Sequence, residues 1–413
     1  MDVSSLIEKE KQRQRDTLMM IPSENYTYPE VRKAVGSILM HKYAEGYPGK
    51  RYYQGMEFVD QIESEARKQA KILFKTPHAN VQPYSGSPAN SAVYFALLEP
   101  KDTILGLTLS HGGHLTHGHP KITFSGRYFN TVHYQLSLES KNTGYFDFKE
   151  ILKIAKKEKP KIIVAGTTAF PRIINWKEFA KIADEVGAYL MADISHIAGL
   201  VAGGSHPSPV PYADIVTTTT HKTLRGPRGA LIMVTEKGMK KDPQLGDKID
   251  KAVFPGLQGG PHLHTIAGIA IALQKAQSDD FKAYAQQVVK NASALAKELI
   301  NNGFNLVTDG TDNHLIVVDL RNFNIDGKRA AEKLEKAGIV VNANTIPNDP
   351  NPPFKPSGIR LGTPALTVRG MREQEMKIIA DIMLKSLDSD QDQLTIIADN
   401  VKKLLADYPI DLE

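Results

Sequence analysis

Short apolar runs rich in β-branched residues alternate with amphipathic segments along residues 60–235, and this alternation constrains the fold more than any other feature of the chain. It is typical of βα units, in which helices cover a mostly parallel sheet. Residues 176–186 carry apolar side chains at helical spacing and are expected to cover one face. Strands are expected at residues 103–107, 131–136, 161–165, 188–192, 215–218 and 230–234. The sequence therefore predicts a doubly wound α/β domain.

The pattern changes after residue 262, where two helical stretches, at 262–277 and 281–301, follow each other without a strand between them. The remainder predicts a small α+β unit, with strands near 304–307 and 314–319, a helix near 328–337 and a closing helix from about residue 372. Five prolines between residues 344 and 356 exclude a helix or a central strand there. A chain of 413 residues exceeds the size of one hydrophobic core. We therefore expect an N-terminal arm (1–25), a large domain (26–277) and a smaller C-terminal domain (278–413).

Composition and charge exclude several classes of protein. No apolar run approaches the ~18 residues that cross a bilayer, and the charged N-terminal segment lacks the apolar core of a secretory signal. The absence of cysteine excludes thiol catalysis, disulfides and thiolate metal sites. The net charge of +5 comes from basic residues interspersed with acidic ones, and no aromatic residue interleaves with the densest basic stretch, residues 153–161. We therefore expect a cytoplasmic protein with neither a membrane nor a nucleic-acid partner.

The segment Ser85-Gly86-Ser87-Pro88 predicts the start of a helix. Ser87 is a good N-cap, and Pro88 suits the first helical position. A helix that begins here leaves backbone N–H groups and serine hydroxyls pointing outward, and such an end binds phosphate. A plain capped helix is the alternative, because the glycine spacings of dinucleotide and P-loop sites are both absent.

An acid and a lysine follow two of the expected strands. Asp193 ends the strand at 188–192, and ligands of parallel sheets bind outside the carboxyl ends of strands. Lys222 follows the threonines at 217–220 and precedes a turn rich in glycine and arginine. Positive neighbours disfavour a protonated amine, which makes Lys222 a candidate for Schiff-base formation. Taken alone, the acid could be a helix cap and the lysine a surface residue; a phosphate cradle, a strand-end acid and a strand-end lysine together favour a pyridoxal phosphate enzyme.

Two further segments are unusual in composition. Residues 111–119 hold four histidines, which could ligate zinc or stack on an aromatic ring. No neighbouring carboxylate completes a metal site there, so no metal is predicted. Residues 42–53 hold four tyrosines and Glu45 in a turn-rich segment. This composition favours an interface or the edge of a ligand site over a plain packed loop.

With these segments in this order, the chain resembles serine hydroxymethyltransferases from about Ile21 to the C-terminal helix. The motifs that carry the resemblance are Ser23-Glu24-Asn25, residues 42–53, Ser85-Gly86-Ser87, residues 111–118, 193–199 and 217–229, Phe254-Pro255 with Gln258-Gly259-Gly260-Pro261, and residues 357–364. The resemblance implies a fold-type-I pyridoxal phosphate enzyme, a homodimer whose active sites are shared between subunits. Such enzymes interconvert serine and glycine while passing the one-carbon unit to and from tetrahydrofolate.

The resemblance also implies roles for individual residues at the cofactor. Lys222 would form the Schiff base, Asp193 would pair with the pyridinium nitrogen, and His114 would stack on the ring. The other cofactor-binding residues it implies are Ser85, Gly86 and Ser87 at the phosphate, Thr168 and His196 at the phenolic oxygen, Thr219, Gly259, and Tyr43 and Gly260 from the neighbouring subunit.

At the substrates, the resemblance implies that Arg360 holds the amino-acid carboxylate in a bidentate fork. Glu45 of the other subunit would handle a proton near the serine hydroxyl and the folate, with Tyr53 beside it. His221, next to the lysine, would tune reaction specificity. The remaining residues expected at the substrates are Ser23 and, at the folate, Leu109, Gly113, Leu115, Phe254 and Asn344.

The chain departs from the family pattern at Thr168, where many members have serine, at Pro171-Arg172, and in its short N-terminal arm. Threonine keeps the hydroxyl, so the cofactor contact survives. A folate-independent aldolase with the same cofactor is the alternative enzyme, but it would not require Glu45, Tyr53 and the loop at Asn344 together. A basic nucleic-acid-binding protein is a third hypothesis, which predicts steep salt dependence of binding and no chromophore.

Overall fold

A seven-stranded sheet forms the centre of the computed structural model, which describes residues 2–137 and 144–412. The strand order is β4-β10-β9-β8-β7-β5-β6, and β10 alone runs antiparallel to its neighbours. The strands are β4 (His78–Asn80), β5 (Thr103–Leu107), β6 (Asn130–Tyr134), β7 (Ile162–Gly166), β8 (Tyr189–Asp193), β9 (Ile215–Thr219) and β10 (Ala230–Val234). The mostly parallel sheet is confirmed, and each of the six expected strands is present within two residues of its predicted bounds.

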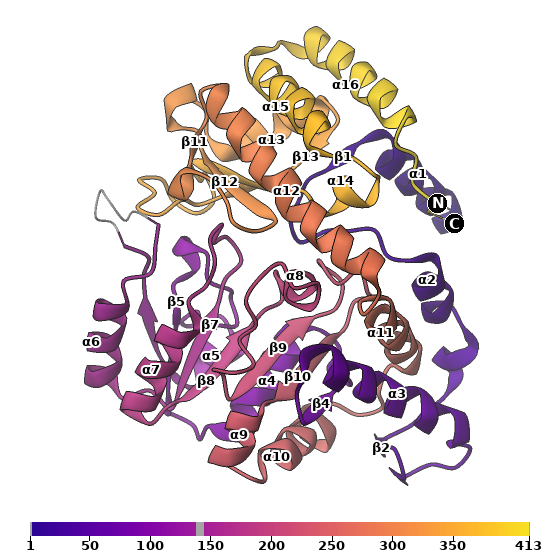
Figure 1. Cartoon of the computed structure of the whole chain (residues 1–413), viewed down its shortest axis with the longest axis vertical. Helices are drawn as coiled ribbons and strands as arrows, with labels where there is room; N and C mark the ends of the chain where they lie inside the picture. Colours follow the sequence, from indigo (N-terminus) through magenta and orange to yellow (C-terminus); the bar gives the residue numbers. More distant parts are fainter. Residues whose placement is uncertain (1, 138–143, 413) are drawn as a thin grey trace.

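Helices cover both faces of this sheet (Figure 1). Along β7, Ile163 and Ala165 join one apolar core while Ile162 and Val164 join another, as expected for a strand whose side chains alternate between faces. The helices in the first core include α3 (Glu57–Phe74), α6 (Phe148–Glu158), α7 (Trp176–Val186) and α11 (Leu263–Lys275). Those in the second include α4 (Gly86–Leu97) and α10 (Leu245–Lys251). The doubly wound arrangement is therefore confirmed.

A second, smaller unit contains the C-terminal part of the chain and most of the N-terminal segment. Its antiparallel sheet has the order β11-β12-β15-β14. The strand pair β1 and β13 ties the N-terminal segment to this unit, because Leu18 and Met20 are buried in its core. Its elements are α1 (Val3–Asp16), β1 (Leu18–Met19), β11 (Asn305–Leu306), β12 (Leu315–Asp319), α13 (Gly327–Lys336), β13 (Ile339–Val340), β14 (Asn342–Asn344), β15 (Gly358–Gly362), α14 (Pro364–Val368), α15 (Glu373–Asp388) and α16 (Gln391–Ala406). The expected closing helix is thus two helices, because Asp390 caps a new one and accepts the Gln393 N–H.

The long helix α12 (Asp279–Asn301) runs between the two units (Figure 1). Phe281 and Val288 from its first half are buried in the core of the large unit. Leu295 and Leu299 from its second half are buried in the core of the small unit. A break at residues 276–278 separates α12 from α11, two residues before the break at 278–280 that the sequence predicts. We propose that the boundary between the large and the small domain lies between residues 277 and 278.

Short elements complete the chain. They are α2 (Pro29–Val35), β2 (Gly46–Tyr47), β3 (Lys50–Arg51), α5 (Phe124–Tyr128), α8 (Ala198–Ala202), α9 (Glu236–Lys241), single turns at Ile38–His41, Leu109–His111, Val307–Asp309 and Arg321–Phe323, and a kinked π-helical segment at Ala252–Leu257. Residues 345–357 form no helix or strand, as the prolines predict. Across residues 2–137 and 144–412, no helix combines the length and apolar character needed to cross a membrane.

Candidate active site

A cavity of about 530 Å³ lies at the carboxyl ends of β8 and β9, where the strand order predicts a ligand site. Elements from both units form its wall, since residues of α4 and of the loop after β9 line it together with Arg360 of β15. The predicted residues that line it are Ser23, Ser85, Gly86, Ser87, Leu109, Gly113, His114, Leu115, Thr168, Asp193, His196, Thr219, His221, Lys222, Asn344 and Arg360. The fold therefore brings together residues that lie more than 300 positions apart in the sequence.

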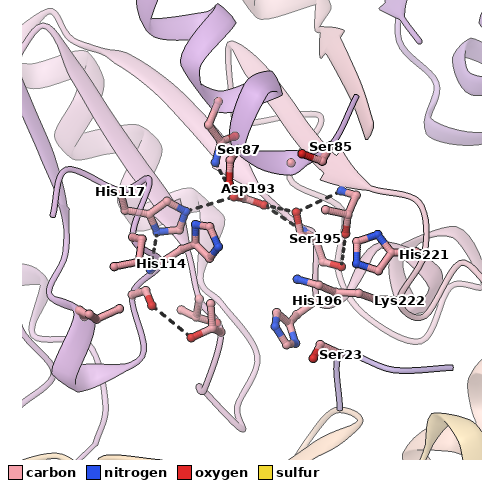
Figure 2. Close-up of a pocket in the computed structure, with 18 of the residues that line it drawn as sticks. Ser23, Ser85, Ser87, His114, His117, Asp193, Ser195, His196, His221 and Lys222 are labelled. Atoms are coloured by element: carbon pink, nitrogen blue, oxygen red, sulfur yellow. Dashed lines mark hydrogen bonds and ion pairs between the residues drawn. The ribbon is translucent and has the colours of Figure 1, made fainter. Parts of the chain in front are cut away.

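Asp193, the last residue of β8, holds a fixed negative charge at this wall, and its side chain is 10 % exposed. Its Oδ2 accepts hydrogen bonds from His117 Nε2 at 3.1 Å and Asn90 Nδ2 at 2.9 Å. Its Oδ1 accepts from the Ser195 backbone N–H at 3.0 Å and the Ser195 hydroxyl at 2.6 Å (Figure 2). Burial alone would raise the pKa of Asp193, but hydrogen bonds, His117 first among them, hold the pKa well below its usual range.

His117 and Asn90 were not predicted as site residues. The His114 N–H donates to His117 Nδ1 at 3.3 Å, so in neutral His117 the ring proton lies on Nε2, which donates to Asp193. Asn90 lies one turn after Gly86 on α4, and its side chain also accepts a hydrogen bond from Thr217 at 2.8 Å. The helical spacing of Gly86 and Asn90 was the available signal for Asn90, and the position of His117 within the four-histidine run was the signal for His117.

The first turn of α4 borders the cavity, and Ser87 lies close to the Asp193 carboxylate (Figure 2). The N-cap is Ser85 and not Ser87, so that prediction is wrong by two residues. Ser87 and Pro88 lie inside the first turn, where proline removes no helical hydrogen bond. The Ser85 side chain makes no capping bond, so neither serine blocks the helix N-terminus and both line the cavity. This end of α4 is suited to an anionic group.

Lys222 extends into the cavity from the loop that follows β9 (Figure 2). The loop is held by backbone bonds from Thr220 N–H to Gly229 O at 3.1 Å and from Gly226 N–H to Thr220 O at 2.8 Å. The Asn25 amide donates to the Lys222 carbonyl at 3.1 Å. Burial lowers the pKa of Lys222 to about 8, against the opposing attraction of Asp193. About half of the amine is therefore neutral, and nucleophilic, at about pH 8.

The three histidines predicted for the cavity are all neutral at pH 7. Burial lowers the pKa of His114 to about 4 and that of His221 to about 3, and it lowers the pKa of His196 well below its usual range. His114 Nδ1 lies 2.7 Å from the Thr116 hydroxyl, which fixes the ring. Within the part of the chain that the structure describes, no group of three or more metal-ligating side chains occurs.

Arg360 on β15 carries a guanidinium that faces the cavity. Its Nε donates to Asn342 Oδ1 at 3.1 Å, and its Nη1 donates to the Thr168 carbonyl. Burial lowers the pKa of Arg360 to about 10, so it remains positively charged. It forms no ion pair with a carboxylate among the residues described, which leaves donors free for an anionic ligand.

The remaining predicted residues, Tyr43, Glu45, Tyr53, Phe254, Gly259 and Gly260, do not line this cavity. The Tyr43 and Tyr53 rings lie 5.4 Å apart and are 57 % and 40 % exposed. A Cβ added at Gly260 would lie 3.0 Å from the Tyr43 ring, and one at Gly259 would lie 3.3 Å from Glu45 Oε1. One chain therefore carries two separate sets of predicted site residues, a deep cavity and an exposed cluster.

Comparisons with known proteins agree with the sequence motifs. The family described as "Serine hydroxymethyltransferase" matches residues 1–383. A protein of that name from Desulfotalea psychrophila is 55 % identical over 410 residues, covering 99 % of this chain and 94 % of that protein. Another of the same name from Acidothermus cellulolyticus is 52 % identical over 415 residues, covering 98 % and 95 % respectively.

Proposed function

Because this chain belongs to the serine hydroxymethyltransferase family, we infer that it interconverts serine and glycine and transfers the one-carbon unit to and from tetrahydrofolate. Its cofactor is pyridoxal phosphate, and it acts as a homodimer. The observation in its own structure that supports this function is the arrangement of Lys222, Asp193 and Arg360 around one cavity. A nucleophilic amine, a fixed carboxylate and an unpaired guanidinium there match an amino acid bound beside a cationic ring.

The residues of the cavity fit pyridoxal phosphate. The uncapped N-terminus of α4, with Ser85 and Ser87, would hold the phosphate. Asp193 stays charged and would keep a proton on the ring nitrogen. Lys222 would hold the aldehyde carbon. When bound, this cofactor withdraws electrons from the α-carbon of the attached amino acid.

We propose that Arg360 binds the substrate carboxylate through its free guanidinium donors while Asn342 and Thr168 fix the plane of the guanidinium. Because the Arg360 guanidinium is largely buried, this pairing is stronger than it would be at a water-exposed position. His114 lines the cavity near Asp193, where its neutral ring would lie against the cofactor. His196, Thr168 and Thr219 line the same wall and would contact the cofactor ring or its substituents.

A second cavity of about 460 Å³ shares Leu109, Gly113, Thr168 and Asn344 with the first. We propose that tetrahydrofolate occupies this continuation, with Leu115 and Asn344 at its edge. Five predicted residues do not line the cavity of their own chain. They would then complete the site of the neighbouring subunit: Tyr43, Glu45, Tyr53, Phe254 and Gly260.

The decisive assay measures serine cleavage by the holoenzyme with and without tetrahydrofolate. If the enzyme is a folate-dependent hydroxymethyltransferase, glycine should form rapidly only when tetrahydrofolate is present. Equal rates in both samples would favour the folate-independent aldolase instead. We also propose a cytoplasmic location, which the absence of cysteine accommodates and which cell fractionation would test.

Mixing two impaired variants tests the sharing of residues between subunits. Lys222→Ala should be inactive and Glu45→Gln should keep only a small residual activity, whereas a mixed dimer would combine an intact Lys222 with an intact Glu45 in one of its two sites. After subunit exchange at equal ratio, activity should recover to about a quarter of the wild-type value. Exchange would be confirmed by native mass spectrometry, and continued inactivity after exchange would place Glu45 in the site of its own chain.

A further inference from the structure

Arg51, the last residue of β3, has a guanidinium that connects residues 44–46 to the helix α3. Its side chain is only 2 % exposed. Nη1 donates to two carbonyls, Ala44 O and Gly46 O, each at 2.8 Å. These two residues flank Glu45 directly, and Arg51 therefore holds the backbone on both sides of it.

The backbone of Glu45 itself is fixed by the same hairpin. The Tyr52 N–H donates to Glu45 O at 3.1 Å. Gly46 pairs with Arg51 across β2 and β3, and it has a φ of +96°. A Cβ at Gly46 would lie 2.3 Å from the Lys50 carbonyl, so only glycine fits this close approach. The three consecutive carbonyls of residues 44–46 thus all accept hydrogen bonds from the β3 side of the hairpin.

Two carboxylates of α3 hold the guanidinium in turn. Asp60 accepts from Arg51 Nε at 2.9 Å, and the fully buried Glu63 accepts from Nη2 at 2.7 Å. Gln82 donates to Glu63 at 2.9 Å and to Gly46 O at 3.0 Å, which links α3 to the same carbonyl. A planar guanidinium with donors on all three nitrogens can make these contacts together, and an ammonium group cannot.

We propose that Arg51 is a positioning residue for Glu45, held by Asp60 and Glu63 so that the Glu45 carboxylate projects at a fixed angle from the exposed cluster toward the site of the neighbouring subunit. This inference rests on the role proposed for Glu45. Neither Arg51 nor its two carboxylate partners lines the cavity, and the contacts that connect Arg51 to Glu45 run through the 44–46 backbone. A displacement of about 1 Å at a reacting group can lower a rate about a hundredfold.

A double-mutant cycle tests the coupling. Arg51→Lys should lower tetrahydrofolate-dependent serine cleavage by about 10- to 100-fold while leaving the amount of bound cofactor unchanged. Added to Glu45→Gln, Arg51→Lys should cost less than about twofold more, since the group it positions is already absent. Asp60→Asn, which perturbs the less buried partner, should follow the same pattern if Arg51→Lys folds poorly. The proposal would be overturned if Arg51→Lys and Asp60→Asn each lowered the activity of Glu45→Gln by the same factor as they lower the activity of the wild type.

The mixed-dimer experiment separates positioning from general damage. Arg51→Lys mixed with Lys222→Ala should recover activity, because the intact Lys222 of one subunit then meets a correctly placed Glu45 from the other. Arg67→Lys is the matched control. Arg67 also pairs with a carboxylate, Asp250, and a carbonyl, Ala79 O, and it lies over the Tyr47 ring, but it donates to none of the carbonyls of residues 44–46, so the activity of this variant should be unchanged.

If the Glu45→Gln mixture recovers and the Arg51→Lys mixture does not, the inference about Arg51 is wrong. If the Glu45→Gln mixture itself stays inactive after exchange, the proposed contribution of Glu45 across the interface is wrong. In that case the double-mutant cycle by itself tests whether Arg51 acts through Glu45.

Discussion

Replacing Lys222 with alanine should eliminate the covalent bond between the enzyme and pyridoxal phosphate and reduce turnover by at least about a thousandfold, the scale of loss on removing a catalytic nucleophile. Lys222 is the lysine that lines the cavity beside Asp193. Borohydride reduction followed by peptide mass spectrometry would locate the attached cofactor. Lys240→Ala, at an exposed position of α9, is the control and should keep the attachment. A reducible bond that persists in Lys222→Ala would contradict the assignment.

The lowered pKa of Lys222 adds a pH dependence to this result. Because the neutral amine is the nucleophile and the pKa is about 8, attachment of cofactor to the apoenzyme should accelerate with rising pH and level off above about pH 8. An ordinary exposed lysine would still accelerate at pH 10. The rate of borohydride-trapped attachment, measured from pH 6 to 10, distinguishes the two profiles.

Truncation of Arg360 is expected to weaken binding of serine and glycine strongly. A charge-assisted bidentate pair in a partly desolvated site is worth roughly 2 to 5 kcal/mol on truncation, or about 30-fold to several thousandfold in affinity. Arg360→Ala should therefore lose glycine affinity on this scale while retaining cofactor. Arg360→Lys should recover little, because an ammonium cannot reproduce the planar fork.

Two other cations serve as controls for Arg360. Lys355 is mostly exposed and lies 4.0 Å from Asp326, and Arg369 donates to the Arg15 carbonyl. Neither lines the cavity. Lys355→Ala should cost under about 1 kcal/mol. Glycine titrations monitored by the visible spectrum of the bound cofactor would test all variants, and unchanged affinity in Arg360→Ala would move the carboxylate site elsewhere.

Periodicity in the sequence was sufficient to predict the large sheet, because buried parallel strands are short apolar runs and the helices between them have a clear apolar face. Periodicity was insufficient where a strand or helix forms only because of a contact with a distant part of the chain. β1 is two residues long and exists through its pairing with β13, more than 300 positions away. The start of α16 was predictable in principle, since Asp390 and Gln393 have the spacing of a capping box.

The same distinction applies to the site. Asp193 and Lys222 were found because strand ends meet at one edge of a parallel sheet. Ser85 and Ser87 are both residue types that commonly cap a helix. The sequence alone does not show that α4 begins at Gly86, which makes Ser85 the N-cap. His117 contacts Asp193 across 76 positions, and the arrangement of the strands and helices between them sets that contact. The tyrosine-rich composition of residues 42–53 pointed to an interface or ligand edge, but the assignment of these residues to the site of a neighbouring subunit came only from the family resemblance.

The helix α12 has a consequence for how the protein unfolds. Its first half is part of one apolar core and its second half part of the other. Loss of either unit would expose large side chains such as Phe281 or Leu299, each worth about 1.5–3 kcal/mol when buried. The stabilities of the two units are therefore linked by this helix, and melting should be a single cooperative event in which neither unit outlasts the other.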